Sequence, residues 1–376
     1  MILLVNARLV DPVAGRETSG GLLVAQGAIA DVGPHLAAGA GPEGAAVIDC
    51  RGQVVAPGLV DLQAFIGEPG AEHRETLSSA SRGAAAGGIT TLVCRPDTDP
   101  VIDDPAIVDF VLRRARAASA VRIHPCAALT KGLAGREMTE IGLLKEAGAV
   151  AFGDAHRSVM NAQVMRRAMV YARDRDAVVS HFTQDANLAA EGSMNEGEFA
   201  SRLGLPSIPK VAETIMLERD LALARITGVR YHAALISCAQ SVETIRRAKD
   251  EGLAVTCGVS VNHLTLNEGD VGDYRTFLKL SPPLRSEEDR QAIGGCGSGR
   301  QGVQQARQRD LFRMDEAQGG GEHRLEANRA IGGFSERLAL RLDVLRIVIG
   351  DDGVDHALSE ASDQRLPILL RAQRRR

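Results

Sequence analysis

The sequence predicts an α/β protein in which a small N-terminal β module precedes a parallel (β/α)₈ barrel. Short apolar segments alternate with longer amphipathic segments over residues 56–293, in units of roughly 25 to 50 residues, as in repeated βαβ units. Seven strand candidates in a row favour a barrel over an open doubly wound sheet. No Gly-x-Gly-x-x-Gly motif follows the first strand, which argues against a dinucleotide-binding fold.

Residues 1–55 have the pattern of the β module. Turn residues separate short apolar segments at Asp11-Pro12, at Gly27 and in the Gly/Pro/Ala-rich stretch 33–45. The strands expected in this module are Ile2–Val5, Gly21–Ala25 and Ala46–Ile48.

Residues 56–293 carry the barrel pattern. The predicted strands are Leu59–Leu62, Thr90–Cys94, Arg122–Ala127, Ala149–Phe152, Ala177–His181, Tyr231–Ile236 and Leu253–Val259. The predicted helices between them are Glu75–Ala86, Ala106–Ala118, Ala162–Arg173, Val211–Thr227 and Val242–Glu251. In a parallel barrel, functional side chains project from the carboxyl ends of the strands.

Residues 294–376 differ in composition from the rest of the chain. A stretch rich in Gly, Gln and Arg begins at Gly294, and a strand–helix pattern returns only at Leu338–Ile349. We expect a divergent and partly disordered tail, so that the C-terminal part of the barrel is atypical or incomplete. A disrupted reading frame is an alternative explanation, which the nucleotide sequence would test.

Composition excludes several classes of function. A net charge of −4 without a basic cluster argues against nucleic acid or an anionic membrane as a partner. The six cysteines are scattered without CxxC spacing, which indicates buried thiols in a reducing compartment. There is no signal peptide at the N-terminus and no apolar run of membrane-spanning length, so we expect a cytoplasmic protein.

Several dispersed motifs lie between residues 57 and 285. They are Pro57–Leu62 with Glu68-Pro69-Gly70, Cys94–Pro100, Met194–Glu198, Leu203–Pro206, Ala212-Glu213, Thr227-Gly228 with Tyr231-His232, and Lys279–Arg285. Together they resemble the motifs of dihydroorotases in the cyclic-amidohydrolase superfamily. The resemblance implies a TIM-type barrel whose N-terminal β module pairs with strands from the C-terminal end. It also implies two metal ions that activate a hydroxide for attack on a cyclic amide, with a carboxylate as proton shuttle.

This chain departs from the family pattern at the positions that carry the chemistry. Gln63 and Phe65 stand where the family has two metal-binding histidines, and Leu235 replaces another. Gly67 replaces an arginine that would bind the substrate carboxylate. Asp97 replaces an asparagine of the substrate loop, where a negative charge would repel an anionic substrate. The tail offers no match to the family's final Asp-His pair.

Two metal-ligand positions keep their residues, Asp154 and His181. A catalytic zinc needs about three protein ligands and an open position for water, so two ligands do not suffice. We expect structural roles, with Asp154 at a strand or helix end and His181 as a hydrogen-bonded barrel histidine. An alternative is a new carboxylate–His₂ site formed by Asp154, His156 and His181.

The sequence therefore predicts a catalytically inactive dihydroorotase-like protein of pyrimidine biosynthesis. By resemblance to non-catalytic members of the family, it would be a structural subunit that binds aspartate transcarbamoylase, or else a homo-oligomer. No cofactor is expected, although zinc would be the metal if the family site is retained. The alternative is a metal-dependent cyclic amidohydrolase with an altered site, which interconverts dihydroorotate and carbamoyl-aspartate or hydrolyses a related cyclic ureide.

Overall fold

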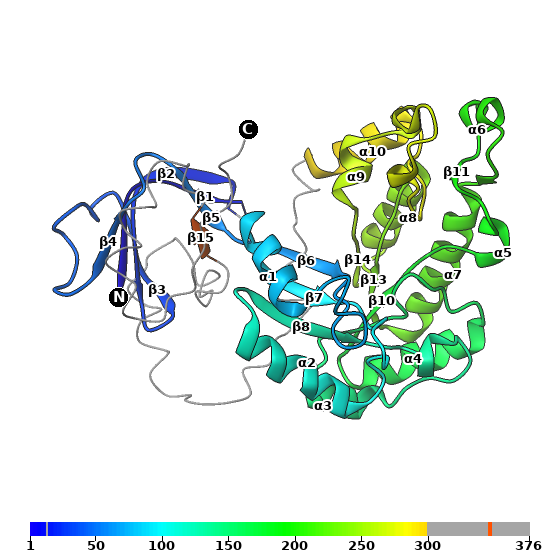
Figure 1. Ribbon diagram of the computed structural model, residues 1–376, viewed down its shortest axis with the longest axis horizontal. Coiled ribbons are helices and arrows are strands. Elements are labelled where there is room, and N and C mark those ends of the chain that lie inside the picture. The colour runs from blue at the N-terminus through cyan, green and yellow to red at the C-terminus, as the bar shows by residue number, and fades with distance from the viewer. Residues whose placement is uncertain (13, 299–344, 348–376) are drawn as a thin grey trace.

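The computed structural model describes residues 1–12, 14–298 and 345–347. It has a β module that contains the N-terminus and a curled sheet of parallel strands wrapped by helices (Figure 1). The predicted α/β barrel class is confirmed, because strands and helices alternate and the seven strands of the larger sheet are all parallel. The segment expected to supply an eighth strand lies outside the described residues.

The β module is a six-stranded sheet in the order β15-β5-β1-β2-β3, with β4 paired to β1. Its strands are β1 (Ile2–Asp11), β2 (Arg16–Ala25), β3 (Ala28–Gly33), β4 (Ala46–Asp49), β5 (Val54–Pro57) and β15 (Leu345–Ile347). Alternate residues of β1 and β2, among them Leu4, Leu9 and Leu22, form its buried core. β15 runs antiparallel to β5, so Leu345–Ile347, the described part of the predicted segment 338–349, pairs with the module, as the family resemblance implied.

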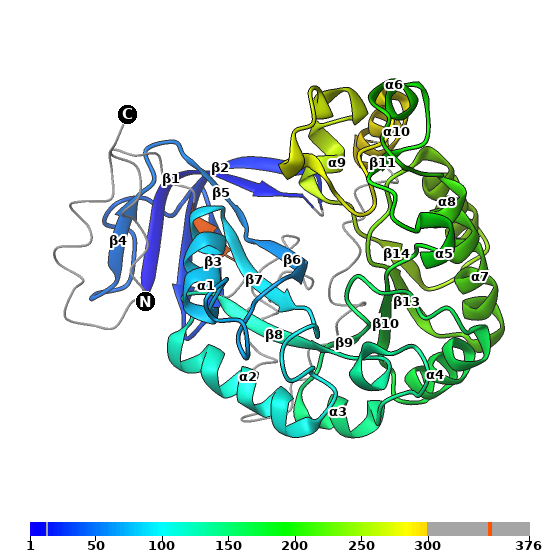
Figure 2. The ribbon, with the colours of Figure 1, turned by 45° about the vertical axis from the view of Figure 1, so that its right-hand side comes forward.

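The barrel sheet has the order β6-β7-β8-β9-β10-β13-β14, which follows the chain. Its strands are β6 (Leu59–Ala64), β7 (Ile89–Cys94), β8 (Arg122–Ala127), β9 (Ala151–Phe152), β10 (Val178–His181), β13 (Arg230–Ala233) and β14 (Val255–Cys257). Their side chains alternate between an outer layer, which packs on the helices, and an inner cluster that includes Val93, Cys126 and Val178. β6 and β14 are the two terminal strands of the curl (Figure 2).

The helices α2, α3, α4, α7 and α8 lie along the outer side of the curl (Figure 2). The helices are α1 (Leu77–Ala86), α2 (Pro105–Ala118), α3 (Ile141–Ala147), α4 (Ala162–Asp174), α5 (Ala186–Ala189), α6 (Glu198–Leu203), α7 (Val211–Thr227), α8 (Ala239–Asp250), α9 (Val261–Thr265) and α10 (Glu287–Ser298). Capping explains their boundaries, since Asp104 caps α2 before Pro105, and Gly228 ends α7 in the left-handed region. None of the helices in the described ranges is long and apolar enough to cross a membrane.

Smaller elements complete the fold. They are the short strands β11 (Met194–Asn195) and β12 (Ser207–Ile208), which pair with each other, and the 3₁₀ helices η1 (Lys131–Leu133), η2 (Glu268–Val271) and η3 (Thr276–Leu278). Several strands end earlier than the sequence predicts: β13, for example, ends at Ala233 although Ala234 and Ile236 are also buried. Apolar residues continue beyond the strand, where the Ala234 and Ile236 N–H groups donate to the carbonyls of His181 and Gly258.

Candidate functional site

The carboxyl ends of the parallel strands form the candidate site, because parallel strands bring these ends to one side of the sheet. The positions singled out in the sequence all lie there: Gln63 in β6, Phe65 and Gly67 after it, Asp97 after β7, Asp154 after β9, His181 at the end of β10 and Leu235 after β13. The structure thus places these seven residues in one region. It does not bond them to one another as a metal site would.

Gln63 makes a hydrogen bond across the barrel. Its Nε2 donates to Ser180 Oγ at 3.1 Å, although β7, β8 and β9 separate their strands β6 and β10 in the sheet. Gln63 therefore links two distant strands directly, at a position where the family resemblance predicts a metal-binding histidine. Ser180 was not predicted as a site residue, because nothing distinguishes it from other small buried residues within a strand.

Phe65 packs between two arginines. The guanidinium carbon of Arg74 lies 4.5 Å from the centre of the Phe65 ring, and that of Arg95 lies 5.4 Å from it. Both contacts are within the range of cation–π attraction. Phe65, where the family resemblance predicts the second histidine, is thus a hydrophobic platform for two cations, which would themselves repel a metal ion.

Asp97 is held in an ion pair. Its carboxylate accepts hydrogen bonds from Arg95 Nε at 3.1 Å and from Arg95 Nη2 at 2.6 Å, and His156 Nδ1 lies 3.5 Å from Oδ2. Burial tends to raise the pKa of Asp97, but the contacts with His156 and Arg95 outweigh it and lower the pKa to about 2. The repulsion expected from Asp97 is therefore offset by the Arg95 charge.

The loop after β6 has no room for a side chain at Gly67. A Cβ atom there would lie 2.3 Å from the carbonyl oxygen of Ala71 and 3.1 Å from that of Glu75. The Ala71 N–H also donates to the Gly67 carbonyl at 2.5 Å, which holds the loop in this tight turn. An arginine at this position would therefore require the turn to change its backbone conformation.

Asp154 binds a neighbouring loop with both carboxylate oxygens. Oδ1 accepts from the backbone N–H groups of Leu129 and Thr130, each at 2.9 Å, and the Thr130 hydroxyl donates to Oδ2. Burial raises the pKa of Asp154, while the Thr130 hydrogen bonds act in the opposite direction. Asp154 therefore ties the loop after β8 to the end of β9.

His181 is fully buried, and both of its ring nitrogens are bonded. Nε2 accepts a hydrogen bond from the backbone N–H of Val159 at 2.8 Å, while Nδ1 lies 2.6 Å from Asp220 Oδ2. Because Nε2 accepts, the imidazole proton belongs on Nδ1, which donates it to Asp220. The lone pair that could bind a metal is therefore occupied by a backbone N–H.

Asp220 is the residue of this region that the sequence analysis missed. It lies in α7 with no exposed surface and also accepts from Tyr231 Oη at 2.8 Å and from Arg219 Nη2 at 2.6 Å. Burial raises its pKa, but the His181 and Arg219 contacts outweigh burial and lower it. The available signal was an acid on the buried face of the predicted helix, one residue before Leu221.

The alternative site of Asp154, His156 and His181 is not assembled. His156 is exposed and faces Asp97, while the ring of His181 faces α7. Among the described residues, no group of three or more His, Cys, Asp or Glu side chains is placed to hold a metal ion.

Two other histidines lie in the barrel strands. Burial lowers the pKa of His124 and of His232 to about 4, so both are neutral at neutral pH. The Nε2 atoms of both are buried without a hydrogen-bond partner in the described part of the chain. His263 instead donates from Nε2 to the carbonyl of Pro282 at 3.1 Å.

Comparisons of the sequence identify its relatives. The profile of a family described as "Dihydro-orotase-like" matches residues 52–241. The chain is 42% identical over 292 residues to a dihydroorotase of Solibacter usitatus, covering 78% of this chain and 67% of that protein. It is 41% identical over 292 residues to a dihydroorotase of Syntrophus aciditrophicus, with 78% and 68% covered. The chain belongs to the dihydroorotase family.

Solved structures agree with the fold of this dihydroorotase-family protein. An L-hydantoinase from Arthrobacter aurescens superimposes with a TM-score of 0.67 at 24% identity, covering 78% of this chain and 65% of that one. A D-hydantoinase from Thermus sp. gives a TM-score of 0.64 at 19% identity, with 80% and 67% covered. The matched part spans about two thirds of the length of these relatives.

Dihydroorotases normally use zinc, and the described residues of this family member do not fit it. Zinc takes imidazole, thiolate or carboxylate ligands, whereas Phe65 and Leu235 offer no lone pair and Gln63 bonds to Ser180. The two retained residues, Asp154 and His181, have the relevant atoms engaged by Thr130 and by Val159. A metal would have to displace these bonds before it could bind.

Proposed function

We propose that this protein is a dihydroorotase-family member of pyrimidine biosynthesis that does not catalyse dihydroorotase chemistry. The observation that carries the proposal is the bonding of His181, whose Nε2 accepts the Val159 N–H. A retained ligand residue that is hydrogen-bonded within the protein stabilises the fold and does not hold a catalytic metal. The bond from Gln63 to Ser180 and the packing of Phe65 against Arg74 support the same conclusion.

We further propose a structural role in which the barrel binds aspartate transcarbamoylase as a non-catalytic subunit. A barrel keeps its core and outer helices for assembly even when its functional residues diverge. The buried core of this chain is extensive, and the substitutions cluster at one end of the sheet. This pattern fits a protein whose function depends on binding a partner through its outer surface.

A second candidate is a cyclic amidohydrolase with an altered site. The identity of 42% to a protein named dihydroorotase favours it, since that relative carries the name of an enzyme. In this case groups of the chain other than Asp154 and His181 would have to complete the site.

Metal content and turnover of the purified full-length chain distinguish the two candidates. We expect well under one equivalent of tightly bound zinc and no interconversion of dihydroorotate and carbamoyl-aspartate above a protein-free control. The Solibacter usitatus dihydroorotase, prepared in the same way, serves as the positive control. Stoichiometric zinc together with turnover would support the second candidate and contradict the first.

The partner is tested separately by mixing the chain with the aspartate transcarbamoylase of its own organism. We expect co-sedimentation, together with a higher melting temperature of this chain, because a partner that binds only the folded form stabilises it. Independent sedimentation of the two proteins at all mixing ratios would contradict the structural role and leave the absence of catalysis as a separate result.

A further inference from the structure

Two segments at the carboxyl end of the barrel have little apolar core of their own. The first, residues 190–209, follows β10 and α5 and contains β11, α6 and β12, and the second, residues 266–284, follows β14 and α9 and contains η2 and η3. α6 buries only Ala200, and η2 and η3 bury no residue. In Figure 1, α6 and β11 project away from the barrel strands. Segments with few buried apolar contacts open more readily than the core.

Arg285 joins the two segments. Its side chain is buried, and Nη1 donates to Asn195 Oδ1 at 2.9 Å and to the Ile208 carbonyl at 2.8 Å, both in the first segment. The Arg285 carbonyl accepts from the N–H of Glu268, in the second segment, at 2.8 Å. Asn195 Nδ2 also donates to Glu268 Oε2 at 2.8 Å, which closes a ring of bonds. Hydrogen bonds from a charged donor are stronger than those between neutral groups, so this ring holds the two segments together.

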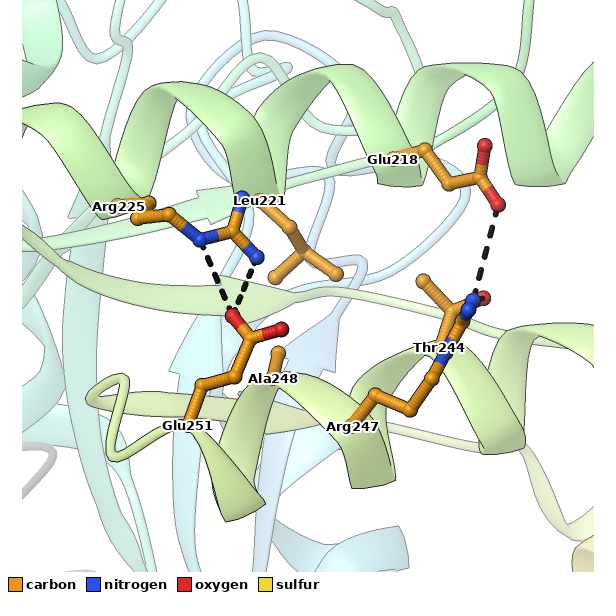
Figure 3. Close-up of a pocket in the computed structure, with 7 residues that line it drawn as sticks. All are labelled: Glu218, Leu221, Arg225, Thr244, Arg247, Ala248 and Glu251. Carbon is orange, nitrogen blue, oxygen red and sulfur yellow. Dashed lines mark hydrogen bonds and ion pairs between the residues drawn. The ribbon is translucent and has the colours of Figure 1, made fainter.

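The other side of the Arg285 guanidinium contacts a rigid base. Its Nε donates to Ser237 Oγ at 3.0 Å, and its Nη2 lies 3.9 Å from the buried carboxylate of Glu213 in α7. Glu213 in turn accepts from the Ser237 N–H at 2.9 Å and from the Ser241 hydroxyl of α8 at 2.5 Å. Two further ion pairs join the same two helices along their length (Figure 3), Arg225–Glu251 and Glu218–Arg247.

Both segments end at one buried acid, Asp289. Lys210 directly follows the first segment, and its Nζ lies 2.5 Å from Asp289 Oδ2. Ser286 directly follows Arg285, and its hydroxyl donates to the same oxygen at 2.7 Å. The Ala239 N–H at the start of α8 donates to Oδ1 at 3.0 Å, which ties Asp289 to the base. The two segments therefore share a fixed point at Asp289 in addition to their bonds with Arg285.

We propose that residues 190–209 and 266–284 form a single cap that opens as one body at the carboxyl ends of β10 and β13, with Arg285 as its latch and Asp289 as its hinge. Opening breaks the bonds that Arg285 shares with both segments and keeps those of Glu213 within the base. The cap thereby controls access to Cys238, which lies between β13 and α8, is 0% exposed and has its Sγ 3.6 Å from Glu213 Oε1. Cap opening needs neither a metal nor a partner protein, so it is independent of the proposed function.

Hydrogen exchange of the full chain, followed by mass spectrometry of its peptides, tests whether the segments open together. In the unsubstituted chain, peptides covering residues 198–204 and 268–279 should exchange with the same dependence on dilute urea. Asn195→Ala should accelerate exchange at least about fivefold in both peptides, because a less costly opening occurs more often. Glu268→Ala should do the same from the other segment. The matched control, Ser201→Ala, removes a bond within the first segment, and exchange in 268–279 should not change.

Thiol labelling tests whether the opening reaches the barrel. Cys238 should react with a small maleimide at least about fivefold faster in Asn195→Ala than in the unsubstituted chain. Cys126, which is 3% exposed in β8, should react at an unchanged rate.

Three results would overturn the cap. Faster exchange confined to the substituted segment, or different urea dependences of the two segments in the unsubstituted chain, would show two independent loops. Faster exchange in both segments with unchanged labelling of Cys238 would place the opening away from the barrel. Equal acceleration of Cys238 and Cys126 would show that the whole barrel opens.

Discussion

His181 illustrates how a residue that the family resemblance predicts to be a metal ligand is bonded within this structure. Its ring connects three segments: the end of β10, the loop at Val159 and helix α7 through Asp220. Gln63 and Asp154 are used similarly, since each bonds to a residue of another strand or loop. These bonds satisfy polar groups that the barrel would otherwise bury without partners.

Replacing His181 should cost stability without any dependence on zinc. His181→Ala leaves Asp220 and the Val159 N–H with lost partners in a buried region, so we expect a loss of about 2–4 kcal/mol in unfolding free energy. Urea unfolding measures the change, and His73→Ala, an exposed histidine, is the control. A loss below about 1 kcal/mol, or an unsubstituted chain whose stability rises with added zinc, would contradict the structural role.

The contacts of Asp97 with His156 and Arg95 should make stability depend on acid pH. The pKa of Asp97 is lowered to about 2 in the folded chain, so its stabilisation is complete above about pH 4 and decreases as pH falls toward about 2. The contribution is about 2 kcal/mol, of which roughly half is lost by pH 3. The unfolding free energies of the unsubstituted chain and of Asp97→Asn, measured with urea, should therefore be closer to each other at pH 3 than at pH 7. An equal difference in unfolding free energy between the two chains at pH 7 and at pH 3 would contradict the stabilising role of these Asp97 contacts. So would a similar pH dependence for Asp109→Asn, which changes an exposed residue.

The sequence predicts the long elements well because their periodicity is strong. Val211–Thr227 matches α7 in full, and Arg122–Ala127 matches β8. The helix α5 and the strand β3 were not predicted, because α5 has only four residues and β3 contains no fully buried residue and so no buried apolar run. The site positions, both substituted and retained, were predicted from motifs. Their bonding was not, because the partners of His181 lie 22 and 39 residues away in other segments.

The loop after β6 should resist restoration of the family arginine. The variant Gln63→His, Phe65→His, Gly67→Arg, Leu235→His should show no dihydroorotase turnover and lower stability, since any Cβ at Gly67 meets the Ala71 carbonyl at 2.3 Å. Gly67→Ala tests the clash alone, and we expect it to lower the free energy of unfolding by about 1–3 kcal/mol. Gly83→Ala in α1 is the control, because no atom lies within 4 Å of its Cβ position, and it should gain up to about 1 kcal/mol. Turnover by the quadruple variant would show that groups outside the described residues complete a site.

The β module and the barrel are joined at the scale of the whole molecule by neighbouring strands. β5 belongs to the module and β6 to the barrel, and only Gly58 separates them. β15 covers the free edge of β5, so a segment from the C-terminal part stabilises the strand that leads into the barrel. An uncovered edge next to this connection would expose unpaired backbone groups and invite association.

Removing β15 should therefore affect the entire molecule. A chain that ends after residue 298 lacks this strand, and we expect a melting temperature lower by at least about 2 °C together with species larger than those of the full chain. The matched control ends after residue 347, which retains Leu345–Ile347 and its pairing to β5. Differential scanning fluorimetry and light scattering compare the three chains. Removal of β15 leaves the backbone groups along the edge of β5 without their partners. If the chain ending at residue 298 nevertheless has the melting temperature and the light-scattering size of the full chain, β15 does not stabilise the module.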